Sequence, residues 1–183
     1  MAQTITQTSV LNFLHNQMGH RVAPGGTDDD LKRYLQASFD YCWRYYKWKW
    51  TLKNTSTIAD GVLPDDFDPL GFYSVSDTYD VTFDYTTSKY VLDPTAAVDL
   101  QYQIVPPTLS DTPVPFPSDA AVAIGALVFA KQGENPSRAD VQQEWDEFHS
   151  LLDRLVGQAE SNVRRRPQSY HDRAGTYVGD VGA

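Results

Sequence analysis

The chain lacks the features that would tie it to export, membranes or disulfide chemistry. It has a single cysteine, Cys42, which excludes an intrachain disulfide and is typical of assembly in a reducing cytoplasm. It contains no run of about eighteen apolar residues and no positively charged, apolar leader. The sequence therefore predicts neither a membrane span nor Sec-dependent export.

Catalytic signatures are also missing. There is no Walker A motif, no dinucleotide-binding glycine motif, no nucleophile elbow and no zinc-protease motif. Asp146, His149 and Asp153 share one face of a predicted helix, but a solvated face with weak charge pairs explains them better than a metal site. We therefore predict a protein that is not an enzyme and that needs no cofactor or metal.

Positive charge is nearly absent from the middle of the chain. Between Asp60 and Asp119 there are eleven aspartates, one lysine (Lys89) and no arginine or glutamate, so this segment sums to −10. The whole chain carries −9, so the remainder sums to +1. An acidic surface disfavours duplex binding as a main task. Charged strand residues also discourage aggregation between sheet edges.

The aspartates of this segment include a close group, Asp65, Asp66 and Asp68, whose oxygens are of the kind that calcium prefers. The group lacks the glycine and the distal glutamate of an EF-hand loop. Turn formation before a proline is therefore the simpler interpretation.

Hydrophobic periodicity predicts helices at 8–18, 28–50, 120–131 and 137–162, and short strands at 51–53, 56–58, 73–85, 89–92 and 98–104. Residues 106–117 contain five prolines and should form an extended strap. The predicted fold is α+β: a bundle of about four helices with an inserted small antiparallel β module and an extended C-terminal tail. We divide this one domain into N-terminal helices (1–50), the β module with its strap (51–117), C-terminal helices (118–162) and the tail (163–183).

The predicted helix at 28–50 has aromatic side chains on two opposite faces. One face carries Phe39, Trp43, Tyr46 and Trp50, and the other carries Tyr34, Tyr41, Tyr45 and Trp48. Such a helix needs two surfaces to pack against, of which the domain core supplies one. The second is either the Asp-rich segment or the first helix, or a neighbouring subunit, since Tyr and Trp are enriched at interfaces. In the latter case Tyr34, Tyr41, Tyr45 and Trp48 are candidate subunit contacts.

Several short motifs follow one another in a particular order. The aromatic helix ends in Trp43 and Trp48-x-Trp50, and a turn, Leu63-Pro64-Asp65-Asp66-Phe67, follows it. The later motifs are Leu92-Asp93-Pro94, the segment at 100–110, Pro115-Phe116-Pro117-Ser118-Asp119, an Ala/Gly-rich helix, and a long helix with Trp145 and Phe148. Over residues 8–162 this order resembles the head–tail connector adaptor (head completion) proteins of tailed bacteriophages.

The resemblance implies a structural protein of the virion neck, assembled in the host cytoplasm. It implies a ring, usually of twelve copies, between the portal protein and a stopper or tail protein, which extends the channel through which genomic DNA passes without specific binding. In the family the C-terminal segment commonly docks on the portal. In this chain that segment is 160–183, with candidate contacts Arg164, Arg165, Arg166, Tyr170 and Tyr177.

Two other interpretations remain open. The strand aromatics and aspartates could form an independent module that binds carbohydrate or calcium, in which case calcium should raise the melting temperature. The chain could also be another phage component, such as a neck or tail-completion protein.

Overall fold

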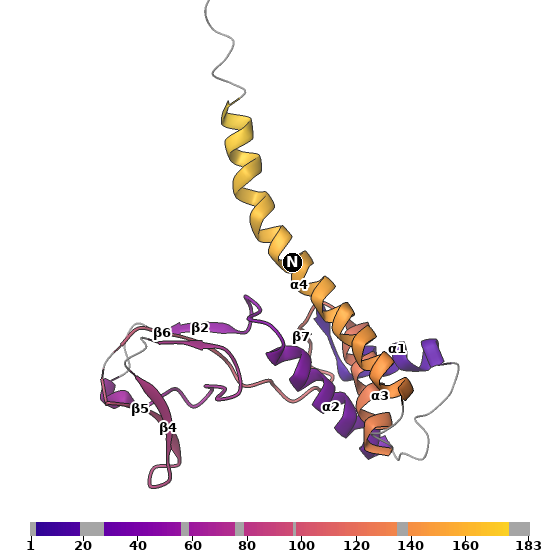
Figure 1. Ribbon diagram of the computed structural model, residues 1–183, viewed down its shortest axis with the longest axis horizontal. Helices are drawn as coiled ribbons and strands as arrows, with labels where there is room; N and C mark the ends of the chain where they lie inside the picture. The colour runs from indigo at the N-terminus through magenta and orange to yellow at the C-terminus, as the bar shows by residue number, and fades with distance from the viewer. Residues whose placement is uncertain are drawn as a thin grey trace, which may run out of the picture.

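A computed structural model describes residues 3–18, 28–55, 59–75, 79–96, 98–134 and 139–175. Figure 1 shows a helical body beside a β module, with one long helix leaving the body. The body consists of α1 (Gln7–Met18), α2 (Asp28–Arg44), α3 (Asp119–Glu134) and the first part of α4 (Ala139–Gly175). The module consists of β2 (Leu52–Thr55), a short 3-10 turn (Ala59–Gly61), β3 (Tyr73–Ser74), β4 (Asp80–Asp84), β5 (Lys89–Asp93) and β6 (Leu100–Gln103). The predicted α+β fold is confirmed.

Helix α3 lies at the centre of the body and packs on the other three helices. It is apolar nearly all round and rich in small residues, which lets neighbouring helices approach closely. Its fully buried residues include Ala121, Val122, Ala123 and Ala126. Larger side chains from α2 and α4, such as Phe39 and Phe148, fill the space around it. The β module lies beside this core, and the long helix α4 extends from it (Figure 1).

The Pro-rich strap, residues 106–117, runs from the β module to the helical body. Its last part, β7 (Val114–Pro115), pairs antiparallel with an N-terminal strand, β1 (Thr4–Ile5), that the sequence did not reveal. Phe116 follows β7 and is fully buried in the helical core. The strap is extended, as predicted, because five prolines in twelve residues remove backbone N–H donors and clash with a preceding helical turn.

The β module contains a three-stranded antiparallel sheet in the order β2-β6-β3 and a separate hairpin, β4–β5. A small core of its own, built on Leu63, Phe67, Leu92, Leu100 and Tyr102, joins the hairpin to the sheet. Residues 73–85 therefore do not form one strand or one hairpin as predicted. Tyr73–Ser74 pairs with β6, whereas Asp80–Asp84 pairs with β5.

One predicted turn is also wrong. Asn54 lies inside the continuous strand β2, where it faces Gln101 of β6, instead of forming a turn between two strands. The pairing with β6 holds this segment extended although its sequence is only weakly β-forming. The second predicted strand, 56–58, lies outside the described residues.

Helix α2 ends at Arg44 and not at Trp50, because side chains occupy its C-terminal carbonyl groups. The last carbonyls of a helix have no partner within it. Here the indole Nε1 of Trp48 donates to the Cys42 carbonyl at 2.9 Å, and the Gln103 amide donates to the Trp43 carbonyl at 2.5 Å. The chain turns back so that Trp48, which is only 1% exposed, enters the core.

Helix α4 is longer than predicted. The sequence predicts an end near residue 162 and an extended tail, but the helix runs to Gly175. Arg164, Arg165 and Arg166 are good helix formers, whereas Pro167 disfavours a helix interior, and the helix passes Pro167 against this preference. The tail segment 163–175 is thus helical, and residues 176–183 lie outside the described part.

Candidate interaction surfaces

Of the three titratable groups that share one face of α4, His149 and Asp153 contact Tyr41 and Tyr45, whereas Asp146 is exposed and accepts a hydrogen bond from Gln142 of its own helix. The ring of His149 stacks on that of Tyr41 at 5.9 Å between centroids, and its Nε2 is 2.7 Å from the Tyr41 hydroxyl. Asp153 accepts a hydrogen bond from the Tyr45 hydroxyl at 2.8 Å. Burial and this bond raise the pKa of Tyr45 to about 12. These contacts therefore hold α4 against the C-terminal end of α2.

The thiol of Cys42, the single cysteine of the chain, is also unsuited to catalysis or metal binding. Cys42 is fully buried, and burial strongly raises the pKa of its thiol. A thiol rather than a thiolate is a poor nucleophile and a poor metal ligand. Among the described residues no group of three or more histidine, cysteine, aspartate or glutamate side chains could hold a metal ion.

The predicted aspartate turn is described in full, and each of its three carboxylates contacts a cationic side chain. Asp65 lies 3.1 Å from Lys89, Asp66 contacts Lys53, and Asp68 lies 2.6 Å from the Nε of Arg44. Burial acts to raise the pKa of Asp66, but hydrogen bonds from Lys53 and Tyr102 outweigh it and lower the pKa. The three carboxylates are thus spread over separate partners on β2, β5 and α2 and do not converge on one point.

The second aromatic face of α2 is covered largely by α4 of the same chain, a cover that the sequence analysis did not consider. Tyr41 contacts Trp145, Phe148 and His149, and Tyr45 contacts His149. Trp48 belongs to the core of its own chain and is therefore wrong as a subunit contact.

Three of the four tyrosine and tryptophan candidates remain partly accessible. Tyr34, Tyr41 and Tyr45 are half-buried. Tyr41 and Tyr45 line a shallow hollow of about 440 Å³ with Ala37, Asp40, Arg44 and Phe129. These residues stay candidates for contact with a second copy.

The C-terminal arm of α4 leaves the body (Figure 1). The first part of α4 packs on the body: Val141, Phe148 and Leu152 are buried, Ala159 packs against the same core, and the Tyr46 hydroxyl donates to Glu160 at 3.2 Å. The next fifteen residues, 161–175, continue the helix for about 22 Å at the standard rise per residue.

This arm contains most of the predicted portal-docking residues. Arg164, Arg165, Arg166 and Tyr170 lie within it, and Tyr177 lies outside the described residues. The arm as defined here, residues 161–175, is the segment that the sequence analysis assigned to an extended tail.

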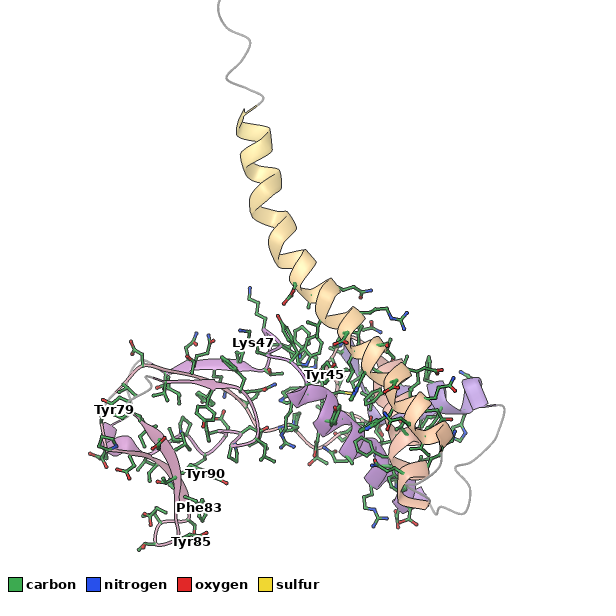
Figure 2. The ribbon with its side chains drawn as sticks, in the orientation of Figure 1. Tyr45, Lys47, Tyr79, Phe83, Tyr85 and Tyr90 are labelled. Atoms are coloured by element: carbon green, nitrogen blue, oxygen red, sulfur yellow. The ribbon has the colours of Figure 1, made fainter. Side chains whose placement is uncertain are left out.

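The tip of the β4–β5 hairpin is a second projecting surface, which the sequence analysis missed. Tyr85 is 88% exposed and Phe83 is 39% exposed, and their rings meet edge to face at 5.1 Å (Figure 2). The alternating pattern indicated a half-buried strand, but it could not show that the aromatic residues at one end extend beyond the core. The register of the hairpin places Phe83 opposite Tyr90, near the tip and away from the Val81–Leu92 pair at the base.

No protein-family model and no curated protein matches this chain. In the described residues, no helix has the length and apolar character needed to cross a membrane.

Proposed function

We propose that this chain is a structural, non-enzymatic virion protein that forms a ring adaptor between the portal and the stopper or tail of a phage. The observation that carries the proposal is the arm of α4, residues 161–175, a helical segment about 22 Å long that leaves the body in Figure 1. An arm of this kind suits a protomer that reaches another protein. Its three consecutive arginines offer planar donors to carboxylates on that partner.

The rest of the molecule is compatible with a ring around a DNA channel. A net charge of −9 gives a surface that repels phosphates, so duplex can pass without binding. The copy number, usually twelve in the family, and the location in the virion neck after assembly in the host cytoplasm follow from the resemblance and belong to the proposal.

The test is co-sedimentation of the purified chain with portal rings from the same genome. We expect the full-length chain to bind, and a chain lacking residues 163–183 to lose binding with an unchanged melting temperature, because the end of α4 lies away from the body (Figure 1). Arg164→Glu/Arg165→Glu/Arg166→Glu should also abolish binding, since like charges then face the partner.

A matched control lies on the same helix. Arg154 is exposed, and in the described structure its side chain hydrogen-bonds only to its own helix, where its Nε donates to the Ser150 carbonyl at 3.3 Å. Arg154→Glu should therefore leave portal binding intact. The proposal is wrong if competent portal rings fail to bind the full-length chain, or if the truncated chain binds as tightly as the full-length one.

A further inference from the structure

The β4–β5 hairpin presents aromatic rings that its own chain leaves uncovered. On one face, Val81 and Leu92 at the base pack into the small core of the β module, with Leu92 only 1% exposed. On the same face toward the tip, Phe83 contacts Tyr90 at 5.0 Å and Tyr85 at 5.1 Å, and Tyr85 is almost entirely exposed. The rings thus form a small apolar surface at the end of a projecting element (Figure 2).

The opposite face of the same hairpin carries two carboxylates without a cation. Asp80 and Asp93 are directly opposite each other across the two strands, and both are exposed. Like charges at such positions destabilise a hairpin. In the described part of the chain neither forms an ion pair, whereas Asp84, nearer the tip, faces Lys89 and binds the turn residues Thr86 and Thr87. A cation from outside the chain would offset this repulsion.

The hairpin also has a free backbone edge. Among the described strands, β4 pairs only with β5, so its other edge has unpaired N–H and C=O groups. Such an edge is able to pair with a strand of another molecule. We call Asp80, Asp93 and this edge the hairpin surface.

A surface of opposite charge lies at the junction of α2 and the β module. Lys47 and Lys49, in the turn after α2, are exposed. The Nζ of Lys47 lies 5.1 Å from the centre of the Phe72 ring, and neither lysine forms an ion pair with the residues that the structure describes. Next to them, β2 is an outer strand of its sheet. We call Lys47, Lys49 and the free edge of β2 the lysine surface.

We propose that the hairpin surface of one copy of this chain binds the lysine surface of the next copy. The ammonium groups of Lys47 and Lys49 would neutralise the Asp80–Asp93 pair, and the free edge of β4 would pair with the free edge of β2. The rings of Phe83 and Tyr85 lie on the opposite face of the hairpin and take no part in this charge contact. The inference rests on the proposed ring function, which requires repeated contact between copies.

The geometry favours a head-to-tail contact. In Figure 2 Lys47 and Tyr85 lie on opposite sides of the β module. A copy can therefore use both surfaces at once, and contacts between two different patches generate a closed ring when the rotation fits. A two-fold dimer that joined the same patch of each copy would place the hairpin carboxylates of both copies next to each other.

The test uses two full-length variants with reversed charge. The hairpin variant is Asp80→Lys/Asp93→Lys, and the lysine variant is Lys47→Glu/Lys49→Glu. Sedimentation velocity at low salt measures self-association, because screening weakens exposed charge pairs. We expect each variant alone to associate about tenfold more weakly than the wild type. Asp99→Lys/Glu147→Lys, with the same change of net charge as the hairpin variant at exposed positions elsewhere, should associate like the wild type.

Mixing the two variants gives the sharpest outcome. The intact hairpin of the lysine variant meets the intact lysine surface of the hairpin variant, and the reversed hairpin meets the reversed lysine surface, so the mixture should regain association in assemblies in which the two variants alternate. A chain with all four substitutions should regain self-association. If the hairpin variant does not fold, Asp80→Asn/Asp93→Asn replaces it, and self-association should again weaken.

Two results would overturn the inference: a wild-type chain that stays monomeric up to about 1 mM, or charge-reversed variants that associate like the wild type. The portal assay separates this failure from failure of the proposed function. Portal binding without the charge dependence keeps the adaptor and rejects this contact. Charge-dependent association without portal binding keeps the contact and rejects the adaptor.

Discussion

At Gly125 of α3, side chains of both α2 and α4 approach the backbone closely. A Cβ atom there would lie 2.6 Å from the Phe148 ring and would also collide with the Ser38 hydroxyl. Neither neighbour can move easily, because Phe148 is fully buried and the Ser38 hydroxyl donates to the Val122 carbonyl at 2.7 Å. The absence of a side chain at this position is therefore a packing requirement.

Gly125→Ala should lower the free energy of unfolding by about 2–3 kcal/mol, because an added methyl group in a filled core forces neighbours out of their rotamers. Urea denaturation followed by tryptophan fluorescence measures the change. Gly157, on an exposed part of α4 where an added methyl group would meet nothing within 4 Å, is the control. Gly157→Ala should raise stability by up to about 1 kcal/mol, since alanine favours helix. Equal effects at the two sites would contradict the packing requirement at Gly125.

Two aspartates near the junction of body and module should respond to pH with opposite signs. Burial raises the pKa of Asp40, although the Gln36 hydrogen bond and the charge of Arg44 act against it. The folded state thus prefers neutral Asp40, and its charge costs stability at neutral pH. That cost disappears as pH falls through the raised pKa to the ordinary value of 3.8. Asp66, with its lowered pKa, adds stability above 3.8 and loses it as pH falls through its folded-state pKa.

Asp40→Asn should therefore raise the melting temperature at pH 7, and Asp66→Asn should lower it. Each change should correspond to less than about 1 kcal/mol, because both carboxylates are partly exposed to solvent. Both differences should shrink in melts recorded below the ordinary aspartate pKa of 3.8, where the wild-type carboxyls become neutral. Shifts of the same sign at pH 7 would contradict the assignment.

At the scale of elements, local pattern predicted those helices and strands whose signals lie in their own residues. The helices at 8–18 and 120–131 are observed as α1 and α3 with small changes at their ends, because apolar spacing and flanking Gly or Pro define them. The strand at 89–92 is observed as β5. The extended strap follows from its prolines alone.

Elements whose limits depend on distant residues could not be predicted. The end of α2 is set by Gln103, which lies on β6, and by the return of Trp48 to the core. The strand β1 has two residues and exists only because Val114 and Pro115 lie beside it. The cover of Tyr41 and Tyr45 by α4 depends on how α4 crosses α2. The same limit applies to the hairpin tip, since exposure of Tyr85 depends on where the module core ends.

At the scale of the whole molecule, buried polar contacts join the helical body to the β module. Gln103 is fully buried and donates to the Trp43 carbonyl and the Thr51 hydroxyl, while its side-chain carbonyl accepts from the Phe72 N–H at 3.0 Å. Arg44, at the end of α2, pairs with Asp68, which is 1% exposed. Because these bonds span both parts, the two cores should unfold together.

Arg44→Ala should uncouple the two parts. It leaves the carboxylate of Asp68 buried without its cation, which should cost about 3 kcal/mol. This loss of stability should affect mainly the β module. All four tryptophans, Trp43, Trp48, Trp50 and Trp145, belong to the core of the body, so fluorescence reports on that part alone. In urea, hydrogen exchange of β4–β6 peptides should accelerate before tryptophan fluorescence changes, whereas the wild type should show both together.

Lys53→Ala removes a more exposed pair with Asp66 and should cost less than about 1 kcal/mol with coincident transitions. Coincident transitions in Arg44→Ala would show that the pair does not join the body to the module.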